Sequence, residues 1–452
     1  MIASIFNTFV DYNDGEKLLY NSFRNSLVKL DKRSHEIYRE ISSDKYDEID
    51  VSDPGVSSIV AELKEGGFVV DNDMNEADYV RVVDIQSRFS HKKHLKLTIS
   101  VTADCNFNCT YCYQNNKKPK YMSGETENKI IDYVNERLET DGELSITWYG
   151  GEPLLALDTI CRLSEAFIKI AGEREARYAA YIITNGYLLS RKVIEKLKQY
   201  RITGAQVTVD GVPEYHDRMR RLKNGKGTFD RIMANIRETV KGENGIRISI
   251  RINIGKGNCY SFPQFVDKLE EYGIKDKVTL AFTQLEPHEY LCQEINDAAL
   301  TPEEYCEVYT RIADIAVERE VNHRIIPDRS MSHCSSTMKE GFLIGSDGKL
   351  YKCWNVVGIQ SECVGEIGKD VKLAEGSLKW LAWDIFQNEM CRGCSILPLC
   401  MGGCPRKTII RDSIVTPMDK CSYMRYNLPE LIRILYRQRK RMREKFERSG
   451  HA

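Results

Sequence analysis

Three cysteines on one short segment, Cys105, Cys109 and Cys112, are the residues of this chain best suited to do chemistry. Thiolates at a CxxxCxxC spacing can bind three irons of a four-iron cluster and leave the fourth iron without a protein ligand. An open position of this kind admits a reactive ligand, whereas a structural metal site has a closed coordination shell. A zinc site is the alternative, so these residues alone predict a metal centre and leave its metal open.

The remaining cysteines predict further metal ligands. The chain contains fifteen cysteines; none precedes Cys105, and eight lie between Cys334 and Cys421. The N-terminus lacks the features of a secretory signal, so we expect a cytoplasmic protein, in which thiols seldom pair as disulfides. The clustered C-terminal thiols are therefore interpreted as metal ligands. Four scattered cysteines fit small buried apolar side chains instead, namely Cys161, Cys259, Cys292 and Cys306.

The overall composition is that of an ordinary globular protein. The 452 residues are 42% hydrophobic and 29% charged, with a formal net charge of −1. The chain has no net positive charge that would attract nucleic acid, and no apolar run is long enough to cross a membrane. The basic segment 428–448 is expected to be a solvated terminal helix, and an RNA-binding tail is the less favoured alternative. We therefore expect no nucleic-acid partner and no membrane partner.

Strand and helix patterns divide the chain into four segments. Residues 1–85 contain short alternating strands and two helices, which is typical of a small winged-helix-like module. Between 90 and 290, six apolar strand patterns alternate with helical ones, which predicts an α/β unit with a parallel sheet, either open or closed into a partial barrel. A bridging segment over 291–333 follows, and a cysteine-rich segment over 334–452 completes the chain.

Small and polar residues follow the predicted strands of the α/β unit, where parallel sheets bind ligands. The predicted strands are 96–101, 144–148, 179–183, 205–209, 247–252 and 278–282. The cysteine segment follows the first strand. The next three strands end in Gly150-Gly151-Glu152-Pro153, Thr184-Asn185-Gly186 and Thr208-Val209-Asp210-Gly211. Two glycines let a ligand approach the backbone closely, and a carboxylate can accept hydrogen bonds from an ammonium group.

The order of these motifs resembles the radical SAM superfamily. The resemblance implies a partial (β/α)6 barrel of the TIM type and a [4Fe–4S] cluster on Cys105, Cys109 and Cys112. S-adenosyl-L-methionine would bind the open iron, and its reductive cleavage would give a 5′-deoxyadenosyl radical that abstracts a hydrogen atom from a C–H bond. The cofactor supplies the difficult chemistry, and the protein supplies orientation.

The resemblance also implies roles for individual residues. Gly150, Gly151 and Glu152 match the site of the cofactor's amino group, and the Tyr111 ring would pack against the adenine. Four residues match positions on the cofactor or substrate side: Thr184, Asn185, Thr208 and Asp210. Asp210 and Glu152 are the candidate catalytic residues, and His216 is a further candidate for a general base.

The C-terminal cysteines resemble the SPASM extension of peptide-modifying radical SAM enzymes, which carries two auxiliary [4Fe–4S] clusters and would bring the total to three. The implied ligands are Cys391, Cys394, Cys400 and Cys421 for one cluster, and Cys334, Cys353 and Cys404 for the other. Cys363 could complete the second of these clusters. Without it, one iron stays open to a substrate thiolate, and we favour this open or exchangeable site. Zinc ribbons are the alternative.

The N-terminal segment resembles the element that holds the leader of a ribosomally made precursor peptide, which adds the leader as a strand to a sheet edge. Together the resemblances predict a peptide maturase that forms a thioether between a cysteine sulfur and a carbon atom, with a flavodoxin or ferredoxin as reducing partner. Carbon–carbon crosslinking of Lys and Trp side chains and formylglycine formation are the alternatives among enzymes. A non-catalytic iron–sulfur electron carrier and a zinc-stabilised binding protein are the alternatives of other classes, although neither accounts for the strand-end motifs.

Overall fold

The centre of the molecule is a sheet of six parallel strands that follow one another in chain order. This computed structural model describes residues 1–43, 49–89, 93–114, 120–241, 246–286, 293–329, 334–369, 375–410 and 421–448. The six strands are β6 (His94–Thr102), β7 (Glu143–Gly150), β8 (Arg177–Thr184), β9 (Ile202–Thr208), β10 (Arg247–Ile254) and β11 (Val278–Gln284). They coincide with the six predicted strands, so the predicted α/β architecture is confirmed.

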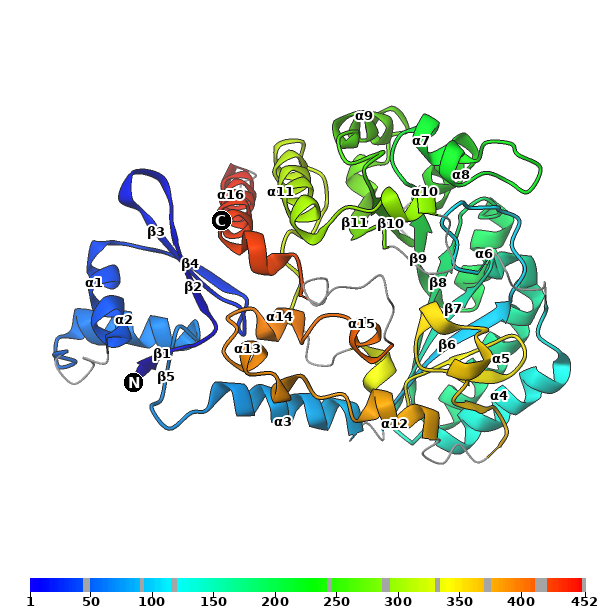
Figure 1. Cartoon of the computed structure of the whole chain (residues 1–452), viewed down its shortest axis with the longest axis horizontal. Coiled ribbons are helices and arrows are strands. Elements are labelled where there is room, and N and C mark those ends of the chain that lie inside the picture. The colour runs from blue at the N-terminus through cyan, green and yellow to red at the C-terminus, as the bar shows by residue number, and fades with distance from the viewer. Residues whose placement is uncertain are drawn as a thin grey trace.

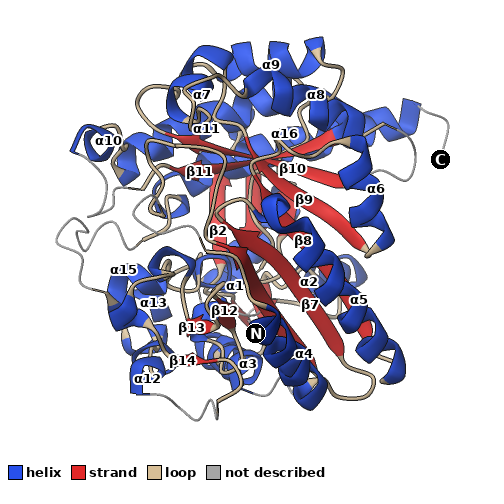
Figure 2. Cartoon of the chain, turned by 90° about the vertical axis from the view of Figure 1, so that its right-hand side faces the viewer, coloured by secondary structure: helices blue, strands red, loops and turns tan. Residues whose placement is uncertain are grey.

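Helices cover the outer face of this curved sheet (Figure 2). They are α4 (Gly124–Arg137), α5 (Leu157–Glu173), α6 (Arg191–Gln199), α7 (Pro213–Met219), α8 (Phe229–Thr239) and α9 (Phe262–Glu271). The period of two along each strand separates the faces. In β10, Ile250 and Ile252 are buried in the core, whereas Arg251 and Asn253 line a cavity on the opposite, inner face.

Three short strands extend the sheet beyond β6. β12 (Phe342–Ile344) pairs with β6 in parallel, and β13 (Lys349–Tyr351) and β14 (Gly365–Glu366) follow as antiparallel strands. The sequence did not predict this extension. Because Cys353 follows β13 directly, the extension places the first C-terminal cysteines beside the cysteine segment that follows β6.

The N-terminal segment forms two small sheets and two helices. A meander of β2 (Asn7–Asp11), β3 (Lys17–Asn21) and β4 (Ser26–Leu30) is followed by α1 (Lys32–Ser42) and α2 (Pro54–Glu65). β1 (Ile2–Ala3) pairs with β5 (Val69–Val70). The Asp31 carboxylate accepts from the Ser34 N–H at 2.7 Å and caps α1, and Asp53 caps α2. The predicted short strands and both predicted helices are confirmed.

A long helix, α3 (Glu76–Phe89), connects this segment to the sheet and was not predicted. It runs along the lower edge of the molecule, beside α12 (Glu375–Leu381) and α13 (Glu389–Arg392) (Figure 1). The other helices that follow the parallel sheet are α10 (Gln293–Asp297), α11 (Pro302–Glu318), α14 (Leu397–Cys400), α15 (Pro405–Ile409) and α16 (Met424–Arg448).

The basic C-terminal helix α16 is only partly solvated, so the expectation of a solvated terminal helix is wrong for its first half. Leu431 and Ile432 are fully buried, and the helix packs against α11. The Arg433 guanidinium donates to the Asp11 carbonyl oxygen at 2.9 Å, and Lys445 pairs with Glu320 at 2.6 Å. Its cations therefore contact both the N-terminal sheet and the segment that follows α11. No described helix is long and apolar enough to span a membrane.

Candidate active site

A cavity of about 300 Å³ lies at the carboxyl ends of the parallel strands. Cys105, Cys109 and Cys112 line it together with residues from the other predicted motifs, namely Tyr111, Gly150, Gly151, Thr184, Asn185 and Thr208. Glu152 and Asp210 are fully buried behind this lining. The strand-end motifs meet at one cavity because parallel strands all end at the same edge of a sheet.

The surroundings of the three thiols suit a metal cluster. Burial raises the pKa of Cys105 to about 12 and that of Cys109 to about 11, so both thiols keep their protons in the absence of a metal. Iron reverses this preference, because a coordinating thiol is deprotonated outright. The N–H groups of Phe107 and Gln114 point at the sulfurs of Cys105 and Cys112 at 3.4 Å, which stabilises thiolates. In the described segments, no three His, Cys, Asp or Glu side chains converge closely enough to hold a single metal ion.

Gly150 and Gly151 are required by a close approach of the chain to itself. Gly150 has a φ of 149°, and a Cβ on it would lie 2.4 Å from the Thr102 carbonyl oxygen. A Cβ on Gly151 would lie 2.2 Å from the Asp104 carbonyl oxygen. The N–H groups of Gly151 and Glu152 donate to these two carbonyl oxygens at 2.9 and 2.8 Å. The glycines therefore lock the end of β7 against the start of the cysteine loop.

Glu152 is a positioning residue in this structure. Its Oε1 accepts from the Thr184 hydroxyl at 2.7 Å and the Leu154 N–H at 3.0 Å, and its Oε2 accepts from the Asn185 N–H at 2.7 Å. Burial raises the pKa of this carboxyl. The side chain has no exposed surface. Glu152 holds the ends of β7 and β8 together, and it could meet an ammonium group or act as a catalytic base only if these hydrogen bonds were exchanged.

Asn185 and Thr208 are placed to contact a ligand in the cavity. The side-chain amide of Asn185 donates to Asn106 Oδ1 at 2.7 Å and lies 3.9 Å from the Cys105 sulfur. Thr208 lines the cavity at the end of β9. These positions agree with the expectation that the third and fourth strand ends face the cofactor or the substrate.

A buried hydrogen-bond network holds Tyr111 in the cavity wall. Its hydroxyl donates to the Asp210 carboxylate and accepts from Arg220 Nη1 at 2.6 Å and Asn253 Nδ2 at 3.2 Å. Asp210 Oδ1 also accepts from the Asn253 N–H at 3.0 Å. Asp210 therefore anchors Tyr111 and Asn253, and its carboxylate does not reach the cavity. The Arg220 Nε–H has no hydrogen-bond partner among the described residues, and Arg220 lines the cavity.

His216 is buried and neutral, which removes it from the candidate bases. Its Nδ1 accepts from the Asp210 N–H at 3.1 Å, so its proton lies on Nε2, which donates to the Thr228 hydroxyl at 3.0 Å. Burial holds the pKa of the imidazole well below its usual value. The ring fixes the turn between β9 and α7 and has no exposed surface.

Comparison with known proteins identifies the cavity. Residues 99–257, which include the cysteine loop and all three glycine-containing strand ends, match the model of the Radical SAM superfamily. Residues 99–257 form the domain of a radical SAM enzyme. This family implies S-adenosylmethionine and a [4Fe–4S] cluster as cofactors. The cavity fits both, because it presents three thiols for iron and the Arg220 Nε–H for an anionic group of the ligand.

Relatives of this radical SAM enzyme include maturases. The cysteine-type anaerobic sulfatase-maturating enzyme of Clostridium novyi is 23% identical over 348 residues, which cover 70% of this chain and 88% of that protein. The structure of native anSMEcpe with bound AdoMet and Kp18Cys peptide is 19% identical, with a TM-score of 0.59 over 77% of this chain and 98% of that chain. The crystal structure of Streptococcus suis SuiB is 16% identical, with a TM-score of 0.52 over 92% of this chain and 100% of that chain. At these identities the two structures show a likeness of fold alone.

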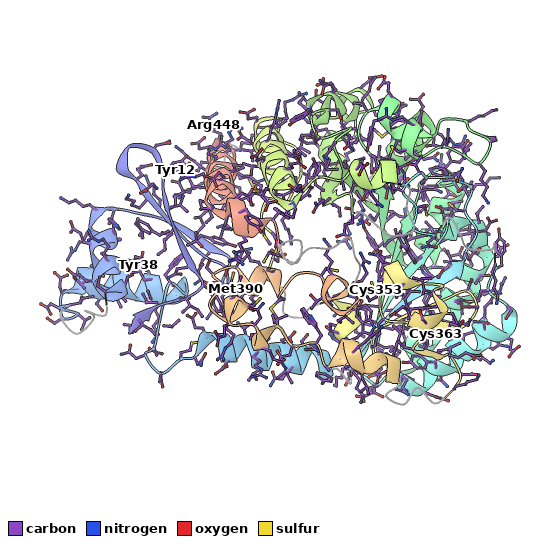
Figure 3. All side chains as sticks on the ribbon, viewed as in Figure 1. Tyr12, Tyr38, Cys353, Cys363, Met390 and Arg448 are labelled. Carbon is purple, nitrogen blue, oxygen red and sulfur yellow. The ribbon has the colours of Figure 1, made fainter. Side chains whose placement is uncertain are left out.

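The first group of C-terminal cysteines consists of Cys334, Cys353 and Cys404. Burial raises the pKa of Cys353 to about 12, and the nearby charges of Cys404 and Cys334 raise it as well. Cys363 lies on the same connection between β13 and β14 (Figure 3), but its thiol donates to the Gly365 carbonyl oxygen at 3.2 Å. Cys334 and Cys404 are thus near enough to Cys353 to influence its pKa, whereas the Cys363 thiol is directed to the backbone of β14.

The second group surrounds α13 and α14. Burial raises the pKa of Cys391, and so do the charges of Cys394 and Cys421. Burial raises the pKa of Cys400, and the charge of Cys394 raises it as well. The Arg425 guanidinium donates to the Cys421 sulfur at 3.4 Å. The charge of Cys394 influences Cys400, and the charge of Glu286 influences Cys404, so these two thiols have different surroundings although they are four residues apart.

Several site residues were missed from sequence. Glu286 lines the cavity just after β11 and forms an ion pair with Lys407 at 3.1 Å. Burial raises the pKa of Cys404, and the charge of Glu286 raises it further. It is the one acidic residue in the described lining of the cavity. The strand-end rule would have found Glu286 and Asn253 if it had been applied to the last two strands. Arg220 follows no strand end, and no sequence signal pointed to it.

Proposed function

We propose that this radical SAM enzyme modifies a ribosomally made peptide and joins a cysteine sulfur of that peptide to a carbon atom as a thioether. The observation that carries the proposal is that the segment after Cys353 and the cysteine loop line the same cavity. Trp354 and Asn355, directly after Cys353, line the same cavity as Cys105, Cys109 and Cys112. A sulfur held beside Cys353 would therefore lie near the place where the carbon radical forms, and such proximity accounts for large rate gains.

When bound, S-adenosylmethionine and its cluster supply a 5′-deoxyadenosyl radical that abstracts a hydrogen atom from carbon. The residues of the chain orient the reactants and exclude water. Arg220 offers its Nε–H to an anionic group in the cavity. The Tyr149 hydroxyl accepts from Gln114 Nε2 at 2.9 Å, and the Tyr149 ring lies 5.0 Å from the Trp354 ring. The two rings line the cavity next to the segment that follows β13.

The two C-terminal cysteine groups are proposed to hold auxiliary clusters of different kinds. Cys334, Cys353 and Cys404 offer three thiolates, which leaves one iron of a four-iron cluster free for the substrate sulfur. The Cys363 thiol donates to a backbone carbonyl, and this supports its exclusion from the ligand set. The second group offers four thiolates, enough to close a cluster, namely Cys391, Cys394, Cys400 and Cys421.

Glu286 is the proposed proton acceptor. Its carboxylate lies in the cavity wall and also near Cys404. It is therefore close both to the cavity, where the carbon radical would form, and to the cysteine group that would hold the substrate sulfur. The Lys407 ammonium, 3.1 Å away, orients this carboxylate. A carboxylate at this position can accept a proton from the substrate thiol as sulfur binds. One hydrogen atom of the substrate carbon would leave with the 5′-deoxyadenosyl group, and the electron that remains when the C–S bond forms would pass to an auxiliary cluster.

The N-terminal sheet is proposed to hold the leader of the precursor. β4 (Ser26–Leu30) is an edge strand that pairs with β3 alone in the described part of the chain. Its free backbone groups can add an extended peptide as a fourth strand. Native anSMEcpe, whose fold this chain shares, has been solved with bound AdoMet and Kp18Cys peptide, which supports a peptide substrate.

The test uses the reconstituted enzyme under anaerobic conditions, with S-adenosylmethionine, reduced flavodoxin or ferredoxin, and the short peptide encoded beside the gene. A thioether predicts the loss of two hydrogens per link together with the loss of one alkylatable thiol, both read by mass spectrometry. Cys105→Ala is the matched control and should form neither 5′-deoxyadenosine nor product.

Each alternative gives a different product. Loss of two hydrogens with every thiol still alkylatable indicates a carbon–carbon crosslink, and loss of two hydrogens together with replacement of the cysteine sulfur by oxygen indicates formylglycine. Either result would overturn the thioether proposal. An unmodified peptide in spite of steady 5′-deoxyadenosine formation would reject this peptide as the substrate.

A further inference from the structure

Helix α3 exposes several large apolar side chains and buries several polar ones. Tyr79, Val82, Ile85 and Phe89 are 43 to 53% exposed. They fall within one third of the helix circumference at 100° per residue, a third that also contains Asp78 and Gln86. The opposite, buried face contains the apolar Ala77 and Val80 together with four polar residues, Glu76, Asp84, Ser87 and Arg88. A surface helix normally keeps its large apolar side chains on the buried face.

The buried polar side chains join three parts of the chain. Glu76 accepts from the Ser4 hydroxyl and the Ile5 N–H, each at 2.7 Å. Arg88 donates to the Leu381 carbonyl oxygen at 2.6 Å and forms an ion pair with Asp84 at 3.3 Å. The fold of the monomer thus explains the inner face of α3 and leaves its apolar stripe exposed along the edge of the molecule (Figure 1).

The stripe is nearly symmetric about its centre. It reads aromatic, aliphatic, aliphatic, aromatic over about 15 Å. In an antiparallel pair of α3 helices, Tyr79 of one copy opposes Phe89 of the other, and Val82 opposes Ile85. Two more exposed apolar side chains extend the pattern. Met74 precedes α3, and Leu378 belongs to α12, which contacts the C-terminal end of α3. A surface that is complementary to itself in this way is what a twofold interface requires.

Charge follows the same symmetry. The exposed Asp73 lies before the N-terminal end of α3, and the exposed Lys339 lies at the C-terminal end, where its N–H donates to the Arg88 carbonyl oxygen at 3.0 Å. An antiparallel pair places Asp73 of each copy near Lys339 of the other. The stripe has no net positive surface for an acidic electron-transfer protein, because Arg81 and Arg392 beside it are paired with Asp384 and Asp78.

We propose that the stripe on α3 is a homodimer interface, in which a second copy of this chain packs its own α3 antiparallel across a twofold axis. The proposal is independent of the thioether reaction, because it concerns a surface outside the cavity and needs no substrate. A single helix pair buries less than the roughly 800 Å² per partner of a standard interface. The dimer is therefore expected to dissociate in the micromolar range.

The test is the molar mass of the full cluster-loaded chain, measured by light scattering and sedimentation velocity from about 1 to 100 μM. Wild type should pass from the monomer mass to twice that mass. Val82→Glu and Ile85→Glu should each raise the dissociation constant at least about 100-fold, because a buried unpaired charge is strongly unfavourable. Met442→Glu, an equally exposed apolar position on α16, should leave it unchanged.

A charge-reversal pair tests the antiparallel register. Asp73→Lys and Lys339→Glu should each weaken the dimer several-fold, and the double variant should restore it. Circular dichroism and iron content confirm that each variant is folded. The proposal is overturned if wild type stays monomeric at 100 μM, or if Val82→Glu and Ile85→Glu dimerise like wild type. It is also overturned if the double charge reversal weakens the dimer by the sum of the two single free-energy effects. Binding of the reducing partner through the stripe by a monomeric chain would also overturn it.

Discussion

The carboxylate of Glu286 and the ammonium of Lys407 lie 3.1 Å apart between the radical SAM cavity and Cys404. Glu286→Gln keeps the shape of the side chain and removes the charge. If Glu286 accepts the proton of the substrate, crosslink formation should fall about 100-fold while iron content stays unchanged. Glu286→Asp should recover part of the rate. Wild-type crosslinking by the Gln variant, measured as product per 5′-deoxyadenosine, would remove Glu286 from the mechanism.

Tyr111→Phe tests the network behind the cavity. The variant leaves Arg220 Nη1 and the Asp210 carboxylate without their shared hydroxyl partner inside a buried region. We expect a loss of about 1–3 kcal/mol in the free energy of unfolding and weaker binding of S-adenosylmethionine. Denaturant titration and equilibrium dialysis measure the two effects. Tyr260→Phe, at a tyrosine that is 65% exposed, is the control and should be neutral.

Gly151→Ala should prevent correct assembly of the first cluster. The added Cβ would lie 2.2 Å from the Asp104 carbonyl oxygen, so the cysteine loop must move. We expect the iron content to fall by about four per chain and 5′-deoxyadenosine formation to be lost. Gly172→Ala introduces the same methyl group in α5, where nothing lies within 4 Å, and should retain full iron and activity.

Cys363→Ala and Cys353→Ala separate the two possible ligand sets. Because the Cys363 thiol is turned to the Gly365 carbonyl oxygen, its removal should leave iron content and product formation close to wild type. Removal of Cys353 should cost about four irons and abolish crosslinking. Equal iron loss in the two variants, measured by iron and sulfide analysis, would mean that the auxiliary cluster is fully ligated by protein.

His323 should make the protein less stable in mild acid. Burial lowers its pKa from 6.5 to about 4, and its Nδ1–H donates to the Leu280 carbonyl oxygen at 3.0 Å. Between these two values the unfolded chain binds a proton that the folded chain does not, so stability is lost as the pH falls from 6.5 toward 4. The loss should reach about 2 kcal/mol by pH 5.

The matched variant is His323→Asn, whose amide can keep the hydrogen bond to Leu280. Its free energy of unfolding should change about 2 kcal/mol less than that of wild type between pH 7 and pH 5, as measured in urea. An identical acid sensitivity in the two proteins would assign the effect to other groups.

The sequence by itself determined the features that depend on neighbours along the chain. The spacing of Cys105, Cys109 and Cys112 within one loop, and the alternation of isoleucines in β10, are local patterns, and both predicted the chemistry and the architecture. The strand-end motifs could be assigned to one cavity because parallel strands have only one carboxyl edge. The N-terminal strands and helices were predicted for the same reason, since caps and turns are local signals.

Only the tertiary structure decided which distant groups share an environment. Glu152 was expected to face a ligand, and the fold surrounds it with Thr184, Leu154 and Asn185 instead. Glu286 and Lys407 are 121 positions apart and meet because α15 packs over the end of β11. The burial of polar side chains on α3 has no local cause, because their partners, Ser4 and Leu381, lie far away in sequence. Burial and charge pairing depend on distance in space, and chain spacing reports that distance only within a single element.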